Sequence, residues 1–437
     1  MRAEAKLAVI AGLAIAGITT VSAAQAQSVS HAASADASWS SSDQVRALVG
    51  EMLSDAETRS SLLEGGPDAG YDGKFFIKSA DGAFRLNIGG QLQFRYTANF
   101  RNPDQVVNDT DFENGFTEPR TRIFFAGNVQ ESGLFFRVMI DFQTSGGNGF
   151  LQDAFSGYDF GNGWQIRAGQ GITAFMREWY MGDFKLFSVE RSLQSLMFGQ
   201  FRSQFAEAKY QNDDVRIIGT FSNGFRSANT DFVNAPAAWA LGGRAEWKFA
   251  GDWKQVTDEY MSPIGSDFAG ALSGAIHFEQ GPDDDTGPAQ DLFAWTADLL
   301  IKGSGWNAML AGVGYHMTDE AGVSGADYDD YGFLAQFGIL VTEKLELVTR
   351  YDVIIPDHDR AANDPFNTIM LGFNYYFHGQ AARFSFAGYW FLDDTTGTMA
   401  GNFADTGARN PTSPLYGSLP SAEDNQVTLM AQFQLLF

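Results

Sequence analysis

The segment Gln426–Phe437, with the sequence QVTLMAQFQLLF, carries the clearest signal of the fold. Apolar and mostly polar residues alternate along it, and its last residue is aromatic. Because successive side chains of a β-strand point to opposite faces, such a strand has one apolar face and one mostly polar face. Strands of outer-membrane β-barrels have this character, since they face lipid on one side and a watery lumen on the other. We therefore predict that Gln426–Phe437 is the closing strand of a transmembrane β-barrel.

The same two-residue period runs through the chain from about residue 70, most clearly in Phe84–Tyr96. Sixteen segments fit it: 84–96, 120–129, 134–142, 151–160, 164–170, 204–210, 215–221, 238–249, 269–278, 293–302, 306–316, 331–341, 345–353, 366–377, 383–391 and 426–437. Bacterial outer-membrane barrels have an even number of antiparallel strands. The pattern predicts an all-β fold, a sixteen-stranded antiparallel transmembrane β-barrel over residues 70–437.

The connections between these segments alternate between tight turns and longer links. This rhythm is typical of barrels whose turns face the periplasm and whose loops face outward. Two connections fit it poorly, because 143–150 is short for a loop and 250–268 is long for a turn.

The N-terminal residues predict export and a small preceding segment. Arg2 and Lys6 precede an apolar run, and Ala24-Gln25-Ala26 has the small-x-small pattern of a cleavage site, so residues 1–26 are interpreted as a secretory signal peptide. Residues 27–69 are expected to contain a disordered stretch and then a short amphipathic helix. The sequence leaves open whether this helix docks on the barrel rim or associates with copies from neighbouring subunits.

Composition excludes several classes of function. The 437 residues include no cysteine, so disulfides and thiolate metal sites are excluded. The net charge of −24 argues against a nucleic-acid partner. No pair of the five histidines has metal-ligand spacing, no catalytic arrangement of Ser, His and Asp is apparent, and no phosphate-binding glycine loop is found. We therefore expect no cofactor, no metal site and no enzyme activity.

The polar phase of the strands predicts a basic lumen. It places on the inner wall a set of arginines, which we interpret as pore-lining: Arg85, Arg95, Arg120, Arg122, Arg137, Arg167, Arg216, Arg244 and Arg350. With Lys209, Lys248 and Arg383 the wall carries twelve basic residues against six acids, so we expect an excess of positive charge that biases which ion enters. The outer loops carry the reverse charge. Their acids are interpreted either as a solvated surface or as weak sites for divalent cations that bridge lipid headgroups.

Several motifs resemble the phosphate-selective porin O/P family. They are Asp72-Gly73-Lys74-Phe75-Phe76, Phe84–Gly90, Gly163–Gln170 and Val189-Glu190-Arg191-Ser192-Leu193. The resemblance implies an outer-membrane porin that is a homotrimer, with a long third loop, residues 171–203, folded into the lumen as a constriction. Its charged residues are Arg177, Lys185, Glu190, Arg191 and Arg202. The arginine ladder and lysine cluster of phosphate-selective members cannot be placed by motif, so a preference for phosphate stays open.

Together these features predict a porin that passes small hydrophilic solutes and ions by diffusion, with a modest anion preference. Its expected partners are outer-membrane lipid, small hydrophilic or anionic solutes and two further copies of the chain. Two alternatives stay open: a barrel enzyme such as a hydrolase, and a structural or receptor barrel without an open pore.

Overall fold

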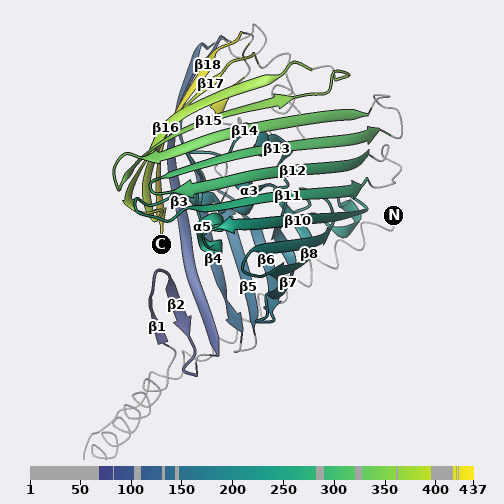
Figure 1. Cartoon of the computed structure of the whole chain (residues 1–437), viewed down its shortest axis with the longest axis vertical. Helices are drawn as coiled ribbons and strands as arrows, with labels where there is room; N and C mark the ends of the chain where they lie inside the picture. Colours follow the sequence, from purple (N-terminus) through teal and green to yellow (C-terminus); the bar gives the residue numbers. More distant parts are fainter. Residues whose placement is uncertain are drawn as a thin grey trace, which may run out of the picture. The chain divides into compact units, whose positions relative to one another are not determined.

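A closed antiparallel barrel of sixteen strands accounts for most of the chain (Figure 1). The computed structural model describes residues 68–437, apart from residues 82, 103–109, 130–132, 143–146, 282–289, 320–326, 361–362, 395–416, 420 and 422. The barrel strands are β3 (Phe84–Phe100), β4 (Phe112–Val129), β5 (Leu134–Phe142), β6 (Gly149–Asp159), β7 (Trp164–Ile172), β8 (Arg202–Gln211), β9 (Val215–Ser222), β10 (Trp239–Ala250), β11 (Ala269–Gln280), β12 (Gln290–Gly303), β13 (Trp306–Asp319), β14 (Tyr328–Leu340), β15 (Leu345–Ile355), β16 (Phe366–His378), β17 (Ala382–Phe391) and β18 (Gln426–Leu436). The predicted fold class is therefore confirmed.

The ring closes between its first and last strands. β18 pairs antiparallel with β3, from Val427 opposite Phe100 to Leu436 opposite Gln91. Beyond the strand, the Gly90 N–H donates to the Phe437 carbonyl at 2.8 Å, and the Phe437 N–H donates to the Gly90 carbonyl at 3.2 Å. A Cβ atom on Gly90 would lie 2.2 Å from Cζ of the Phe437 ring, so only glycine leaves room for that ring. The closing role predicted for the last segment is thus seen in its pairing.

A short hairpin that the sequence did not reveal continues this closure. Strand β1 (Asp68–Tyr71) pairs with β2 (Phe75–Lys78), and β2 pairs with residues 85–88 of β3. The edge of β3 is therefore shared, with β18 covering one stretch and β2 the next. Two strands of four residues are too short for the two-residue period to be recognised.

The outer and inner faces of the barrel wall differ in polarity. Large apolar side chains stay exposed on the outer face, for example Leu92, Phe94, Leu310 and Leu371. Their neighbours on the inner face, such as Gln91, Gln93 and Arg95, are less than 10% exposed. An outward apolar surface around a polar interior is what a strand between lipid and lumen needs. Among the described residues, no helix is long and apolar enough to cross a membrane.

Short and long connections alternate around the barrel, as expected from the sequence. One exception has a structural explanation. The connection 251–268 lies at the short-turn end but contains helix α5 (Trp253–Thr257), whose Val256 is fully buried, and it also buries Tyr260. Its extra length lets it reach into the barrel. The expected signal peptide and amphipathic helix lie outside the described residues.

Deleting Phe437 tests the closure. We expect the variant to assemble poorly in the outer membrane, because the backbone pair with Gly90 and the ring that packs over it are both lost. Heat-modifiable migration and protease resistance of the membrane fraction measure assembly. The matched control is Phe437→Tyr, which keeps both features. Normal amounts of protease-resistant barrel after the deletion would show that closure does not need this residue.

Candidate functional site

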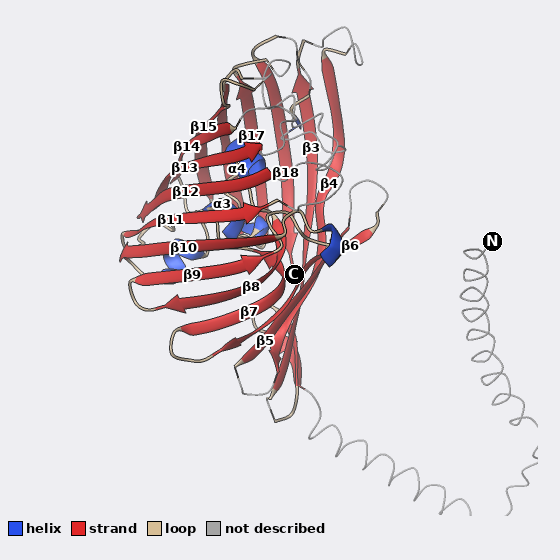
Figure 2. Ribbon diagram, turned by 90° about the vertical axis from the view of Figure 1, so that its right-hand side faces the viewer, coloured by secondary structure: helices blue, strands red, loops and turns tan. Residues whose placement is uncertain are grey.

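The long connection between β7 and β8 folds into the barrel. It contains α3 (Arg177–Tyr180), the 3-10 helix η2 (Asp183–Lys185) and α4 (Leu193–Phe198). Figure 2 shows α3 and α4 within the ring of strands. Helix α4 begins after Ser192, whose hydroxyl accepts the Ser195 N–H at 3.0 Å. We call residues 173–201 the inner loop.

Aromatic residues fix the inner loop in the lumen. Phe175, Trp179 and Phe187 are 2–3% exposed and belong to one apolar cluster that includes residues of the barrel wall. The Trp179 indole N–H donates to the Ser195 carbonyl at 2.7 Å, which ties α3 to α4. Tyr180 and Phe184 stay partly exposed. The first three side chains therefore hold the loop, while the last two border open space.

Glu190 joins the inner loop to two wall arginines. Its carboxylate accepts from Arg95 at 3.0 Å and from Arg120 at 2.6 Å. Burial alone would raise the pKa of Glu190, but the guanidinium groups of Arg120 and Arg95 outweigh burial and lower that pKa to about 2. Glu190 is therefore ionised at neutral pH and neutralises charge that the wall contributes.

Two further loop acids act in the same way. Asp183 binds Arg122 of β4 and Arg191 of the loop itself. Glu178 accepts from Arg350 of β15 at 3.1 Å and also binds the hydroxyls of Ser192 and Ser195. The Arg191 guanidinium also lies 4.1 Å from the centre of the Trp179 ring, where a cation–π contact adds to the ion pair.

On the opposite side of the barrel the charges are exchanged: the loop contributes the cation and the wall contributes the acid. Arg177 binds Asp298 of β12 and donates to the Ser273 hydroxyl at 2.6 Å. Asp298 also accepts from Arg244 at 2.8 Å, and Arg244 donates to the Phe175 carbonyl at 2.6 Å. The loop is thus bound electrostatically to both sides of the barrel.

A bulge in β6 places an acid that sequence parity missed. Met139 pairs with Asp153 and Ile140 with Leu151, so Gln152 is the extra residue, and both Gln152 and Asp153 are buried. Asp153 accepts from Arg202 at 2.7 Å and from Arg137 at 2.9 Å. A strict two-residue period would have assigned Asp153 to the lipid face.

The predicted site residues therefore fall into two groups. The arginines with buried ion pairs are Arg95, Arg120, Arg122, Arg177, Arg191, Arg202, Arg216, Arg244 and Arg350. The less buried cations are Arg85, Arg137, Arg167 and Lys185. Of these, Arg85 pairs with Asp72, and Arg167 pairs with Glu207 at 2.7 Å. Arg177 and Arg191, expected at the charged fringe of the loop, are only 5% and 2% exposed. The loop acids Glu178, Asp183 and Glu190 pair with individual wall arginines, and the loop's own Arg177, Lys185 and Arg191 equal them in number.

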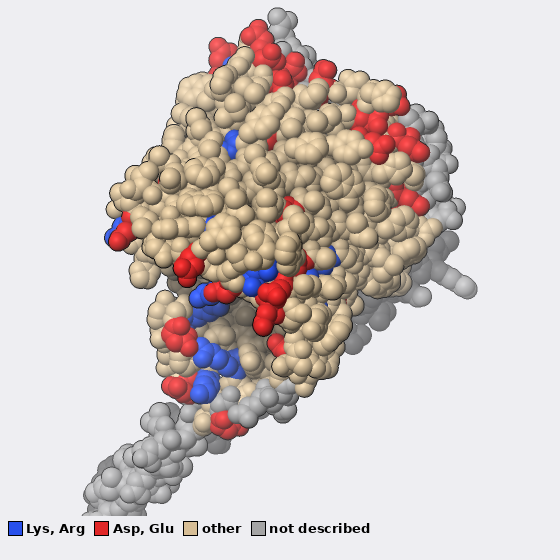
Figure 3. All heavy atoms as spheres, viewed as in Figure 1, with Lys and Arg blue, Asp and Glu red and all other residues tan. Residues whose placement is uncertain are grey.

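The hydrogen bonds and ion pairs of the inner loop are spread unevenly around the wall. They reach β3, β4, β10–β13 and β15–β18. Within the described chain, none of these bonds ends on β5–β9. A cavity of about 380 Å³ lies on that side, lined by residues of β3–β8 and by Tyr180. In the space-filling view the surface is hollowed next to the β1–β2 hairpin, and basic and acidic side chains line the hollow (Figure 3).

One exposed group in an outer connection has the composition of a cation site. Ligand atoms of Asp357, His358 and Asp359 lie within 4.8 Å of one another. Hydrogen bonds from the backbone N–H groups of Asp359 and Asp329 lower the pKa of Asp357. Exposed acidic groups of this kind commonly form without an ion, so both interpretations of the acidic loops stay open.

Comparison with solved structures shows similarity of fold. The anion-selective porin from Comamonas acidovorans superimposes with a TM-score of 0.58 at 12% identity, covering 81% of this chain and 100% of the other. The outer membrane channel DcaP of Acinetobacter baumannii gives 0.53 at 13% identity, with coverages of 82% and 99%. The trimer form of OmpT, an outer membrane protein of Vibrio cholerae, gives 0.51 at 12%, with coverages of 80% and 99%. No family model and no curated protein matches the sequence, so the resemblance to the O/P family remains a prediction.

Replacing Glu190 with Gln tests how the inner loop is held. The change removes the carboxylate that the buried Arg95 and Arg120 share and leaves Arg120 only its longer contact with Asp183 at 3.7 Å. Loss of one partner of a buried pair typically costs about 3–5 kcal/mol. We expect a lower urea midpoint of unfolding and faster proteolysis within the loop. Asp72→Asn, which removes an exposed ion pair to Arg85, is the control and should leave both unchanged. A variant at Glu190 that behaves like this control would contradict the proposed attachment.

The same pair predicts an acid response. The pKa of Glu190 is lowered from its ordinary value of 4.5 to about 2 in the folded state, so its stabilising contribution is complete above pH 4.5 and is lost as the pH falls towards 2. We expect the urea midpoint to decline over this window by more in the native chain than in the Glu190→Gln variant. Parallel declines in both proteins would show that Glu190 makes no such contribution.

Proposed function

We propose that this chain is an outer-membrane porin that passes small hydrophilic solutes and ions by diffusion, with a modest preference for anions. The observation that carries the proposal is the attachment of the inner loop inside the barrel, beside a cavity of about 380 Å³ lined by residues of β3–β8. A sixteen-stranded barrel is wide enough for an aqueous channel, and a loop bound inside it narrows that channel. The porin and the channel among the proteins of similar fold support the same proposal.

Charge along the β5–β9 wall supports the anion preference. Arg137, Arg167 and Lys209 line the cavity together with a single acid, Glu207. Lys209 has no ion-pair partner among the described residues. A ring of fixed charge beside a narrow aqueous path biases which ion enters, and one protein of similar fold is an anion-selective porin. Ion-selectivity measurements in planar bilayers also test whether phosphate is preferred among anions.

We propose further that residues 1–26 are removed on export and that the barrel functions as a homotrimer in the outer membrane. The trimer form of OmpT among the similar folds supports the oligomer. The exposed apolar outer face supports the membrane location. The partners would be membrane lipid and small hydrophilic or anionic solutes.

The enzyme alternative has little support in the described chain. His277 contacts Glu279 at 3.0 Å and His316 contacts Asp329 at 2.9 Å. A nucleophile activated by such a pair would have to bond the other ring nitrogen, and among the described residues no hydroxyl does so. A structural barrel would be distinguished from a porin by the absence of ion conductance.

Ion selectivity in planar bilayers tests the proposal. Under a gradient of KCl, we expect a reversal potential that indicates a chloride preference at 1 M, where the Debye length of about 3 Å screens the acidic outer loops. At 0.01 M it is about 30 Å, so these loops should attract potassium and weaken the preference. The double variant Arg137→Gln with Lys209→Gln should lose most of the preference at 1 M. Replacing chloride with phosphate in the same cell measures their relative permeability.

The control is Lys344→Gln, which removes one positive charge from an exposed turn between β14 and β15. It should leave the reversal potential unchanged. A potassium preference at 1 M in the native protein would contradict the anion preference, and an absence of conductance would contradict the porin proposal itself.

A further inference from the structure

We infer that the cavity lined by β3–β8 and Tyr180 is a binding site for small organic anions that carry a carboxylate on a flat apolar body. This inference deepens the proposed function, because it names a substrate class for the path that the inner loop leaves open.

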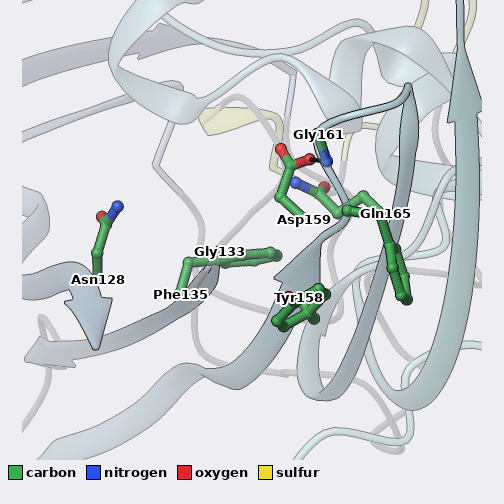
Figure 4. A pocket seen from close by; sticks show the side chains of 8 residues that line it. Asn128, Gly133, Phe135, Tyr158, Asp159, Gly161 and Gln165 are labelled. Atoms are coloured by element: carbon green, nitrogen blue, oxygen red, sulfur yellow. Dashed lines mark hydrogen bonds between the residues drawn. The ribbon is translucent and has the colours of Figure 1, made fainter. Parts of the chain in front are cut away.

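The cavity is built from consecutive strands and one loop residue. Asn128 of β4, Phe135 and Arg137 of β5, Phe155 of β6, Gln165 and Arg167 of β7, and Glu207 and Lys209 of β8 line it, and Tyr180 of the inner loop borders it. An open recess of about 720 Å³ at the rim shares Asn128, Phe135 and Gln165 with it (Figure 4). A solute entering from the short-turn end would therefore meet this cavity next to the inner loop.

Positive charge exceeds negative charge around this cavity. Arg137 shares the single carboxylate of Asp153 with Arg202, and Arg167 is paired with Glu207. Lys209 adds a cation that has no ion-pair partner within the described chain. Three cations, Arg137, Arg167 and Lys209, thus line the cavity with one carboxylate, that of Glu207. An anion would complete the charge balance, and a desolvated wall strengthens its attraction to Lys209.

Aromatic side chains give the cavity a second property. The Arg167 guanidinium lies between two rings, 5.2 Å from the centre of Phe155 and 4.7 Å from that of Phe205, so its position is fixed. The Phe135 ring packs where a side chain at residue 157 would stand, because that position is glycine and a Cβ there would lie 2.4 Å from its Cζ. Phe135, Phe155 and Tyr180 therefore present apolar surface beside the cations.

The combination of cations and aromatic rings favours one chemical class of ligand. An inorganic anion can use the cations but gains nothing from the rings, whereas a sugar can use the rings but not the excess charge. A benzoate-like molecule uses both, since its carboxylate can approach Lys209 while its ring packs on an aromatic face. The amides of Asn128 and Gln165 supply additional donors.

Isothermal titration calorimetry on the full chain, purified in detergent, tests the site with three probes: benzoate, acetate and inorganic phosphate. We expect benzoate to bind at least about tenfold more tightly than acetate or phosphate. Lys209→Gln should weaken benzoate binding by about tenfold or more, as expected for loss of a charge-assisted contact. Lys248→Gln is the matched control, because it removes an inner-wall lysine outside the cavity lining and should have no effect.

Phe135→Leu separates the two parts of the site. It should weaken benzoate binding several-fold and leave acetate binding unchanged, because acetate has no ring to pack. Equal affinities for benzoate and phosphate, or an unchanged benzoate affinity in Lys209→Gln, would overturn the inference.

Conductance of the same preparation in KCl separates this inference from the proposed function. A conducting barrel that fails to bind benzoate would remain a porin without this site. A barrel that binds benzoate through Lys209 but carries no current would keep the site and contradict the porin proposal.

Discussion

A lipid bilayer offers no hydrogen-bond partners to a polypeptide backbone, so every N–H and C=O group of a membrane-spanning strand must be satisfied within the protein. For a sheet, that requirement is met only when no edge remains. In this chain the pairing of β3 with β18 removes the edge, and the sixteen strands form one continuous ring. The outward apolar residues, the polar lumen and the site inside it all presuppose this closure.

Closure creates an interior in which buried charged side chains need partners of opposite charge. Burying an arginine costs several kcal/mol unless a carboxylate of suitable geometry is present. The wall contributes more arginines than acids, and Glu178, Asp183 and Glu190 of the inner loop compensate many of them. These pairs also determine where the loop lies. The partners lie on β3, β4 and β15 and, through Arg177 and Phe175, on β10 and β12, whereas Arg137, Arg167 and Lys209 line a cavity beside the loop.

Much of the barrel could be predicted from sequence, because an alternating strand between lipid and water leaves a strong periodic signal. Strand β5 was predicted with its observed bounds, and β4 was predicted to begin eight residues late, at 120 instead of 112. The cause is Pro119, which falls where the register between β3 and β4 shifts, as expected for a proline at a bulge. A proline interrupts the pattern even where the strand continues.

The site was less accessible to sequence reasoning. The alternation of inward and outward residues along the strands identified the wall arginines. It could not identify their partners in the inner loop, because the path of that loop leaves no periodic pattern in the sequence. Asp153 was missed because a single extra residue, Gln152, reverses the parity of the strand. A bulge of this kind has no reliable sequence signal. The cavity could not be predicted either, since its lining includes Tyr180 and depends on where the inner loop lies in the barrel.

The seam between β3 and β18 also has a kinetic consequence. Gln93 donates to Gln434 across it at 2.8 Å, and 341 residues separate the two in the chain. Contacts between such distant residues form slowly, because the intervening chain must lose conformational entropy before the contacts can stabilise the closed state. The ring therefore cannot be completed until both ends of the chain have been delivered to the same place. During that interval the growing sheet keeps exposed edges, and the large negative charge of the chain would keep such incomplete molecules apart.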